Sequence, residues 1–121
     1  MKLGRLKRFL VVVLGLTTAL VWSAPSLGDT QRIKASGTSW SPDFRHIVKG
    51  DRIVWKNPTG ARHTVTAYGG GWSKDTSLSS GDRTKKRFRR AGTYEFRCTI
   101  HSSLSGDECE GMCGEVHVTR R

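Results

Sequence analysis

The sequence predicts an all-β domain, a sandwich or barrel, behind an amino-terminal export signal. Beyond residue 28 the chain consists of short β-branched and aromatic segments separated by Gly, Pro, Ser, Asp and Asn, a pattern typical of strands and turns. No 11-residue stretch in this part keeps the apolar period of a helix. With 121 residues, 36% of them hydrophobic, the chain can form one domain but not separate cofactor and substrate lobes.

The first 28 residues have the order of a secretory signal peptide. The basic start MKLGRLKR precedes an uncharged apolar run over 9–22, which is shorter than the ~20 residues that span a membrane. Small residues follow, so cleavage is expected near 26–28, after Ser26 or Gly28. We predict a signal peptide at 1–28 and a domain at 29–121, exported to the periplasm, the cell envelope or the extracellular space, without a transmembrane span in the mature chain. An uncleaved anchor is the alternative.

The strands and turns of the domain are predicted in order. The segment IVKGDRIVWKN joins two apolar stretches through a turn at Gly50 and Asp51. HTVTAY, residues 63–68, alternates in the manner of a half-buried strand, and the glycine-rich GGGWSKDTSLSSGD after it indicates a loop. RFRRAGTYEFRC indicates two aromatic segments around an Ala-Gly turn. GEVHV closes the chain with alternate valines on one face.

The formal net charge is +11, and the run RTKKRFRR concentrates much of it. If Phe88 points inward on a strand, then Thr84, Lys86 and Arg90 share its side. The simplest interpretation of the opposite side is a solvated strand face. The functional interpretation is a docking stripe that steers an acidic redox partner or an anionic cell-envelope surface. That side carries four cations: Arg83, Lys85, Arg87 and Arg89.

The three cysteines indicate a metal site. An odd number in an exported protein leaves at least one thiol outside an intramolecular disulfide. Cys109 and Cys113, four residues apart, can pair if their Cα atoms come close enough, which would leave Cys98 as the single reactive sulfur. Cys98, a histidine three residues later, a histidine far upstream and a methionine downstream form the ligand set of a blue-copper site. The other members of this set are His63, His101 and Met112.

Two other metal sites are compatible with the spacing. Cys109, Cys113 and His117 have the spacing of a binuclear copper loop, although that interpretation leaves the C-x-x-H segment unexplained. Alternatively, Cys98 and His101 could join both cysteines in a four-ligand zinc site. Beside the basic run, that site would indicate a zinc-stabilised nucleic-acid-binding domain. His46 and His117 otherwise have the character of ordinary strand residues.

Three motifs resemble the small cupredoxins, the family of plastocyanin, pseudoazurin and amicyanin. WSPDFRHIVKGDRIVWKNPTGARHTV leads to His63, GTYEFRCTIHS carries Cys98 and His101, and GMCGEVHV contains Met112. The resemblance covers roughly residues 33–119 and implies a Greek-key β-sandwich with one type 1 copper held by these four side chains. It also implies that Asn57 ties the ligand loops together and that His101 is the surface electron port.

The methionine departs from this family pattern. Met112 follows His101 by eleven residues, whereas the family's methionine follows its second histidine by about five. The inserted SSLSGDECEG adds three acidic residues and Cys109. A disulfide from Cys109 to Cys113 could hold the base of the longer loop and keep Met112 near the metal. Equally, the insertion could change the axial distance or hide His101.

The sequence therefore predicts a monomeric exported blue-copper protein that carries single electrons between redox proteins. The chain has no glycine-rich phosphate loop and no G-x-S-x-G motif, so we expect neither nucleotide nor hydrolase chemistry, and no enzyme activity. We expect a redox partner with an acidic docking surface, and no nucleic acid. The alternative function is a copper-binding module for delivery or buffering of the metal.

Overall fold

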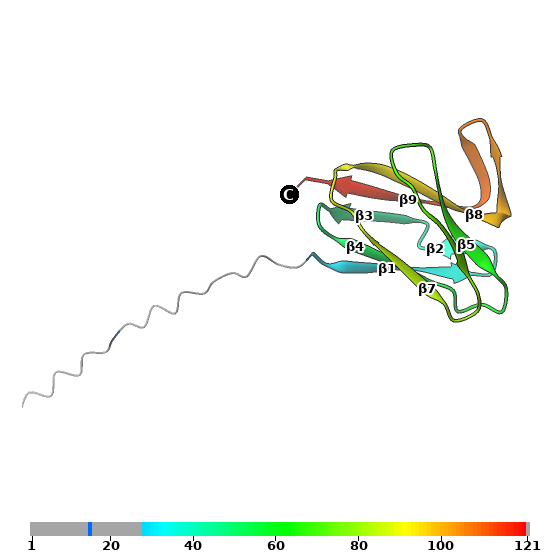
Figure 1. The fold of residues 1–121 in the computed structure, drawn as a ribbon, viewed down its shortest axis with the longest axis horizontal. Coiled ribbons are helices and arrows are strands. Elements are labelled where there is room, and N and C mark those ends of the chain that lie inside the picture. Colours follow the sequence, from blue (N-terminus) through cyan, green and yellow to red (C-terminus); the bar gives the residue numbers. More distant parts are fainter. Residues whose placement is uncertain (1–14, 16–27, 121) are drawn as a thin grey trace, which may run out of the picture.

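The computed structural model of the protein describes residue 15 and residues 28–120. The predicted signal peptide and its cleavage after Ser26 lie outside these residues. The described part contains strands in two sheets that pack face to face, so the predicted all-β sandwich is confirmed (Figure 1). In the same part of the chain, no helix is long and apolar enough to cross a membrane.

Strands that follow one another in the sequence often lie in different sheets, so the chain crosses repeatedly between the two sheets. The four-stranded sheet has the order β2-β1-β4-β7 and the five-stranded sheet has the order β3-β9-β8-β5-β6. Two pairs, β1 with β4 and β3 with β9, are parallel, and the other pairs are antiparallel. The bounds are β1 Thr30–Ser36, β2 Ser39–Ser41, β3 Phe44–Val48, β4 Arg52–Lys56, β5 His63–Tyr68, β6 Asp75–Leu78, β7 Arg83–Arg87, β8 Gly92–Ser105 and β9 Glu108–Thr119.

Alternate residues of the strands form the core between the sheets. The four-stranded sheet contributes Ile33, Ile53 and Trp55, all fully buried. Phe96 of the other sheet meets Trp55 edge to face, with ring centroids 5.4 Å apart, a favoured geometry for aromatic pairs. Cys98 belongs to the same buried cluster. The core therefore extends without a break from the aromatic centre to the thiol at one end of the sandwich.

Two parts of the structure differ from the sequence prediction. The segment predicted as a loop contains β6, because Leu78 can be buried while its strand pairs with β5. In the basic run Phe88 is buried as expected, and Arg83, Lys85 and Arg89 are exposed. Arg87 lies on the outer side as predicted but is less exposed than expected, and Arg90 was predicted on the wrong side. Arg87 is half-buried because its Nη1 donates to Gly50 O at 2.9 Å, and Arg90 is exposed because β7 ends at Arg87 and the alternation stops there.

The inserted segment continues the sheet. Strands β8 and β9 pair beyond the core from Ser102 and Gly111 to Ser105 and Glu108, so the insertion forms a hairpin. Gly106 makes its turn with φ of 61°, a conformation that glycine adopts without strain. Figure 1 shows this hairpin at the end of the sandwich opposite the C-terminus.

Candidate metal centre

Three strands of the five-stranded sheet bring the predicted ligands to one end of the sandwich. His63 is the first residue of β5, Cys98 and His101 lie on the neighbouring β8, and Met112 lies on β9. The register of β8 and β9 shifts between Arg97 and Ser102, so residues 98–101 of β8 stand opposite a single residue of β9, Met112. Such a bulge turns side chains out of the regular alternation. It allows both Cys98 and His101 to approach His63.

Two imidazoles and one thiol converge within hydrogen-bonding distance. Cys98 Sγ lies 3.8 Å from Nδ1 of His63 and 3.5 Å from Nδ1 of His101. The three ligand atoms all lie within 4.8 Å of one another, and the two imidazole rings are tilted at 50°. His63 and Cys98 are fully buried, while His101 is half-buried. Water therefore reaches this cluster from the His101 side.

The spacing of the donor atoms fits a metal ion. An ion about 2.3 Å from sulfur and about 2.0 Å from nitrogen can contact both atoms when they lie within about 4.3 Å. Both sulfur–nitrogen separations, 3.5 and 3.8 Å, are below that limit. One thiolate, two imidazoles and a buried thioether are the donors of a blue-copper site. The set His63, Cys98, His101 and Met112 is consistent with one type 1 copper.

A hydrogen-bonded chain orients the imidazole of His63. The Thr59 hydroxyl lies 2.6 Å from Oδ1 of Asn57, to which it donates, and 2.9 Å from Nε2 of His63. Because the hydroxyl has only one proton, it accepts a hydrogen bond from Nε2. The proton of the neutral ring is thereby held at Nε2, and the Nδ1 lone pair faces Cys98. Burial, and then the nearby His101, lower the pKa of His63, so the ring is neutral at pH 7.

Asn57 fixes the loop that carries His63. Its Nδ2 donates to Ala61 O at 2.7 Å and to Leu78 O at 2.9 Å, and its Oδ1 accepts from the backbone and side chain of Thr59. Every polar position of this fully buried amide is used. The loop of His63 is thus tied to β6. The resemblance implied that Asn57 ties the two ligand segments together. None of these bonds reaches the strand of Cys98, so Asn57 does not join the two segments directly.

Thr64 makes that link. Its backbone N–H donates to Cys98 Sγ at 3.4 Å, and its Oγ1 accepts from the Thr99 N–H at 2.9 Å. These two bonds tie the segment of His63 directly to the segment of Cys98. Sequence reasoning missed both Thr59 and Thr64. The residue directly after a predicted strand histidine gives no signal of its own, and threonine is common in strands and turns.

The predicted disulfide between Cys109 and Cys113 is present. Four extended residues would separate their Cα atoms by about 13 Å, but the two atoms lie 6.2 Å apart. The chain between them therefore turns back on itself. Gly111 has φ of 98°, and a side chain there would collide with the backbone of His101. The folded segment places Met112 in the core, where it is fully buried.

Replacing Gly111 with alanine should both destabilise the protein and change the geometry of the candidate metal centre. We expect a loss of about 2 kcal/mol or more in the free energy of unfolding, because backbone strain and a backbone collision combine. We also expect a changed visible spectrum of the copper-loaded protein. Gly106→Ala is the matched control, since its φ is also positive but nothing lies within 4 Å. Equal losses and unchanged spectra in both variants would show that the approach to His101 is unimportant.

The disulfide decides between the metal sites that the sequence left open. Both the binuclear copper site and the four-ligand zinc site need Cys109 and Cys113 as thiolates, and the disulfide uses both. His117 lies elsewhere, on the outer face of β9. It stacks on His46 of β3 with ring centroids 5.4 Å apart, and both are exposed. They are strand residues outside the candidate centre.

Comparisons with known proteins show the cupredoxin fold. No family model and no curated protein sequence matches the chain. An oxidised amicyanin with a Met-to-Leu substitution superimposes with a TM-score of 0.61 at 22% identity, over 73% of this chain and 80% of that one. A purple cupredoxin from Nitrosopumilus maritimus gives 0.57 at 21%, over 73% and 98%. A copper-containing nitrite reductase from Thermus scotoductus SA-01 gives 0.62 at 22%, over 78% of this chain but 23% of that one.

Proposed function

We propose that this protein is an exported one-electron carrier whose single type 1 copper is held by His63, Cys98, His101 and Met112. The observation that supports this most is the convergence of one thiol and two Nδ1 atoms within 4.8 Å, in a cupredoxin fold. Met112 is proposed as the axial ligand because it alone stands opposite the segment 98–101. Copper bound there would supply the exchange of one electron between Cu(I) and Cu(II).

The surrounding chain would keep the donors in one arrangement for both oxidation states. His63 is held through Thr59 and Asn57, and Cys98 through Thr64. Ligand positions fixed by hydrogen bonds and by strands move little when charge changes. This rigidity favours electron transfer over substrate turnover. It also disfavours copper delivery, which needs ligands that release the metal readily.

His101 is the proposed electron port. It is the half-exposed member of the ligand set, and Ile100 beside it is 51% exposed. Leu104, on the adjoining hairpin, is 41% exposed. Large exposed apolar side chains near one another mark surfaces for protein contact. We propose that a redox partner docks here. Such a partner would have an acidic surface, because residues 29–121 carry 17 Lys and Arg against 10 Asp and Glu and attract it from a distance.

The predicted docking cations lie away from this port. Arg83, Lys85 and Arg87 belong to β7, an edge strand of the four-stranded sheet, and Arg89 follows that strand. His101 belongs to the other sheet. We propose that these four cations attract anionic groups from a distance and do not form the contact surface of the redox partner.

Two features support export of the protein. The segment 1–28 has the composition of a signal peptide, and the disulfide between Cys109 and Cys113 is of a kind that persists in oxidising compartments. We propose that the mature protein acts as a monomer in the periplasm or cell envelope.

Electron self-exchange of the copper protein tests the proposed function. Line broadening in NMR spectra of mixed Cu(I) and Cu(II) protein should reveal fast exchange between molecules, with copper retained against a chelator. Slow exchange together with rapid loss of copper to the chelator would favour the delivery function.

Placing a charge at the port should slow this exchange. In Ile100→Lys, two approaching molecules bring like charges together at the contact, and we expect at least about a tenfold lower rate. Colour and copper content should not change. Thr93→Lys adds the same charge at an exposed position of β8 remote from the port. If both variants exchange equally fast, His101 is not the port.

A further inference from the structure

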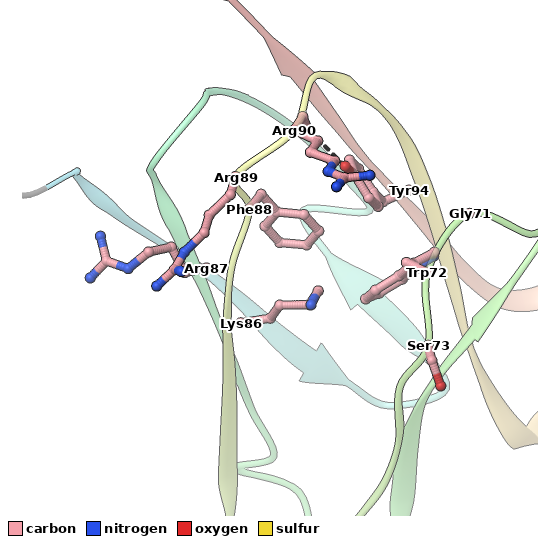
Figure 2. Close-up of a pocket in the computed structure, with 9 residues that line it drawn as sticks. All are labelled: Gly71, Trp72, Ser73, Lys86, Arg87, Phe88, Arg89, Arg90 and Tyr94. Atoms are coloured by element: carbon pink, nitrogen blue, oxygen red, sulfur yellow. Dashed lines mark hydrogen bonds between the residues drawn. The ribbon is translucent and has the colours of Figure 1, made fainter.

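Cations make up most of the outer face of the four-stranded sheet. Alternation directs Ile33, Ile53 and Trp55 into the core, so the residues between them face outward. Figure 2 shows Arg87 and Arg89 turned away from the pocket into which Phe88 points. The outward residues of β1, β4 and β7 include seven cations, which we call the basic face: Arg32, Lys34, Arg52, Lys56, Arg83, Lys85 and Arg87.

Like charges are paired directly across the strands of the basic face. Arg52 is the register partner of Arg87, and Lys56 is the partner of both Arg83 and Lys34. Like charges opposite each other destabilise a sheet. The strands of this sheet contain no acidic residue that could compensate, since their sequences are TQRIKAS, SWS, RIVWK and RTKKR. The nearest acidic residues in the sequence, Asp29, Asp51 and Asp82, stand just before β1, β4 and β7 rather than within them. Like charges paired within the strands oppose local stability, and such an arrangement indicates a function.

The acidic residues of the strands lie in the other sheet. All five occur on β6, β8 and β9, where Glu95 and Glu115 are register partners. The molecule therefore has a basic side and a more acidic side. A charge distribution of this kind orients a protein on an anionic surface. The five are Asp75, Glu95, Glu108, Glu110 and Glu115.

The basic face lacks the features of a protein-binding site. Within residues 28–120 the exposed large hydrophobic side chains are Phe44, Ile100 and Leu104, and none lies on β1, β4 or β7. Its two hollows, of about 380 and 390 Å³, are lined mainly by cations around Val54. Protein interfaces have an apolar and aromatic core. A layer of anionic lipid headgroups needs only cations, each of which strengthens binding.

A pocket of about 600 Å³ lies beside the basic face, and we do not assign it a ligand. The aromatic group Trp72, Phe88 and Tyr94 forms part of its wall (Figure 2), and the cations that line it are Lys86, Arg87, Arg89 and Arg90. The polar atoms of that group are used within the protein, because Trp72 Nε1 donates to Glu95 O and the Tyr94 hydroxyl donates to Arg90 O. The pocket is therefore part of the packing at one end of β7.

We propose that the basic face binds the anionic surface of a lipid bilayer. The core separates this face from the sheet that carries Cys98 and His101. The protein can therefore rest on a membrane while the proposed electron port stays accessible to a partner. The lipid proposal is independent of the copper proposal, since no ligand belongs to β1, β4 or β7.

Vesicle co-sedimentation tests the proposal. The protein should bind vesicles of phosphatidylcholine mixed with phosphatidylglycerol, bind vesicles of phosphatidylcholine alone far more weakly, and dissociate at high salt. Arg83→Gln/Lys85→Gln should bind roughly 30-fold more weakly. Because these substitutions relieve charge repulsion, they should not lower stability. Cys98→Ser should bind like the parent protein, which separates failure of this proposal from failure of the copper site.

The matched control is Lys49→Gln/Arg120→Gln, which removes the same charge from exposed positions outside the basic face. It should bind nearly as well as the parent protein. If both double variants bound anionic vesicles equally weakly, the net charge of the protein rather than the position of the cations would determine binding, and the proposal would be overturned. Binding to polyglutamate but not to anionic vesicles would also overturn it, and would assign the face to an acidic protein.

Discussion

Replacing Cys98 with serine should abolish the intense visible absorption of the copper-loaded protein. That absorption arises from charge transfer between a thiolate and copper, and Cys98 is the only cysteine outside the disulfide. Serine is similar in size and can still accept the hydrogen bond from the Thr64 N–H. The protein should therefore fold but bind copper weakly and without colour. Absorption spectra and metal analysis measure both effects.

The double variant Cys109→Ser/Cys113→Ser is the control for this result. It removes two sulfur atoms and the disulfide but leaves the convergence of His63, Cys98 and His101 intact. We expect it to be less stable by about 2 kcal/mol, from the closure of a short loop, and still coloured. A coloured Cys98→Ser protein or a colourless double variant would assign the metal to a different cysteine.

Replacing Asn57 with alanine should have the second largest effect. The variant loses four hydrogen bonds in a fully buried site and leaves Ala61 O and Leu78 O without the amide donor. We expect the free energy of unfolding to fall by about 3 kcal/mol. Copper affinity should fall as well, because Thr59 no longer holds the ring of His63 in place. Urea unfolding and copper titration measure these two losses.

Pro58→Ala is the control within the same loop. Pro58 is exposed, and its replacement should change stability by less than about 1 kcal/mol, through the unfolded chain. If Asn57→Ala were no more destabilised than Pro58→Ala, the loop of His63 would be held by something other than this amide.

The residues of the candidate metal centre could be predicted because each one lies in a distinctive segment. Three short motifs can be recognised directly in the sequence of 121 residues: the C-x-x-H pair, the histidine after NPTGAR and the GMCG segment. The strand 63–68 was also predicted with its correct bounds, because its β-branched residues alternate in the sequence HTVTAY. Chemistry that depends on a few rare residue types is visible in a sequence.

The arrangement around those ligands could not be predicted. The bulge at 98–101 depends on the pairing of β8 with β9 beyond the core, a pairing between segments that the sequence indicated only as an insertion. The basic face was seen only in β7, because Arg32, Lys34 and Lys56 come from strands distant in sequence that the fold places side by side. Parallel pairing of β1 with β4 leaves no local signal.

Copper titration of the purified protein, followed by visible absorption and EPR, tests the central claim most directly. The account predicts an intense blue or green colour that saturates at one copper per chain, with the balance of the two colours reporting how strongly Met112 engages. A colourless product, or copper bound without a thiolate absorption band, would contradict the proposed centre of His63, Cys98 and His101.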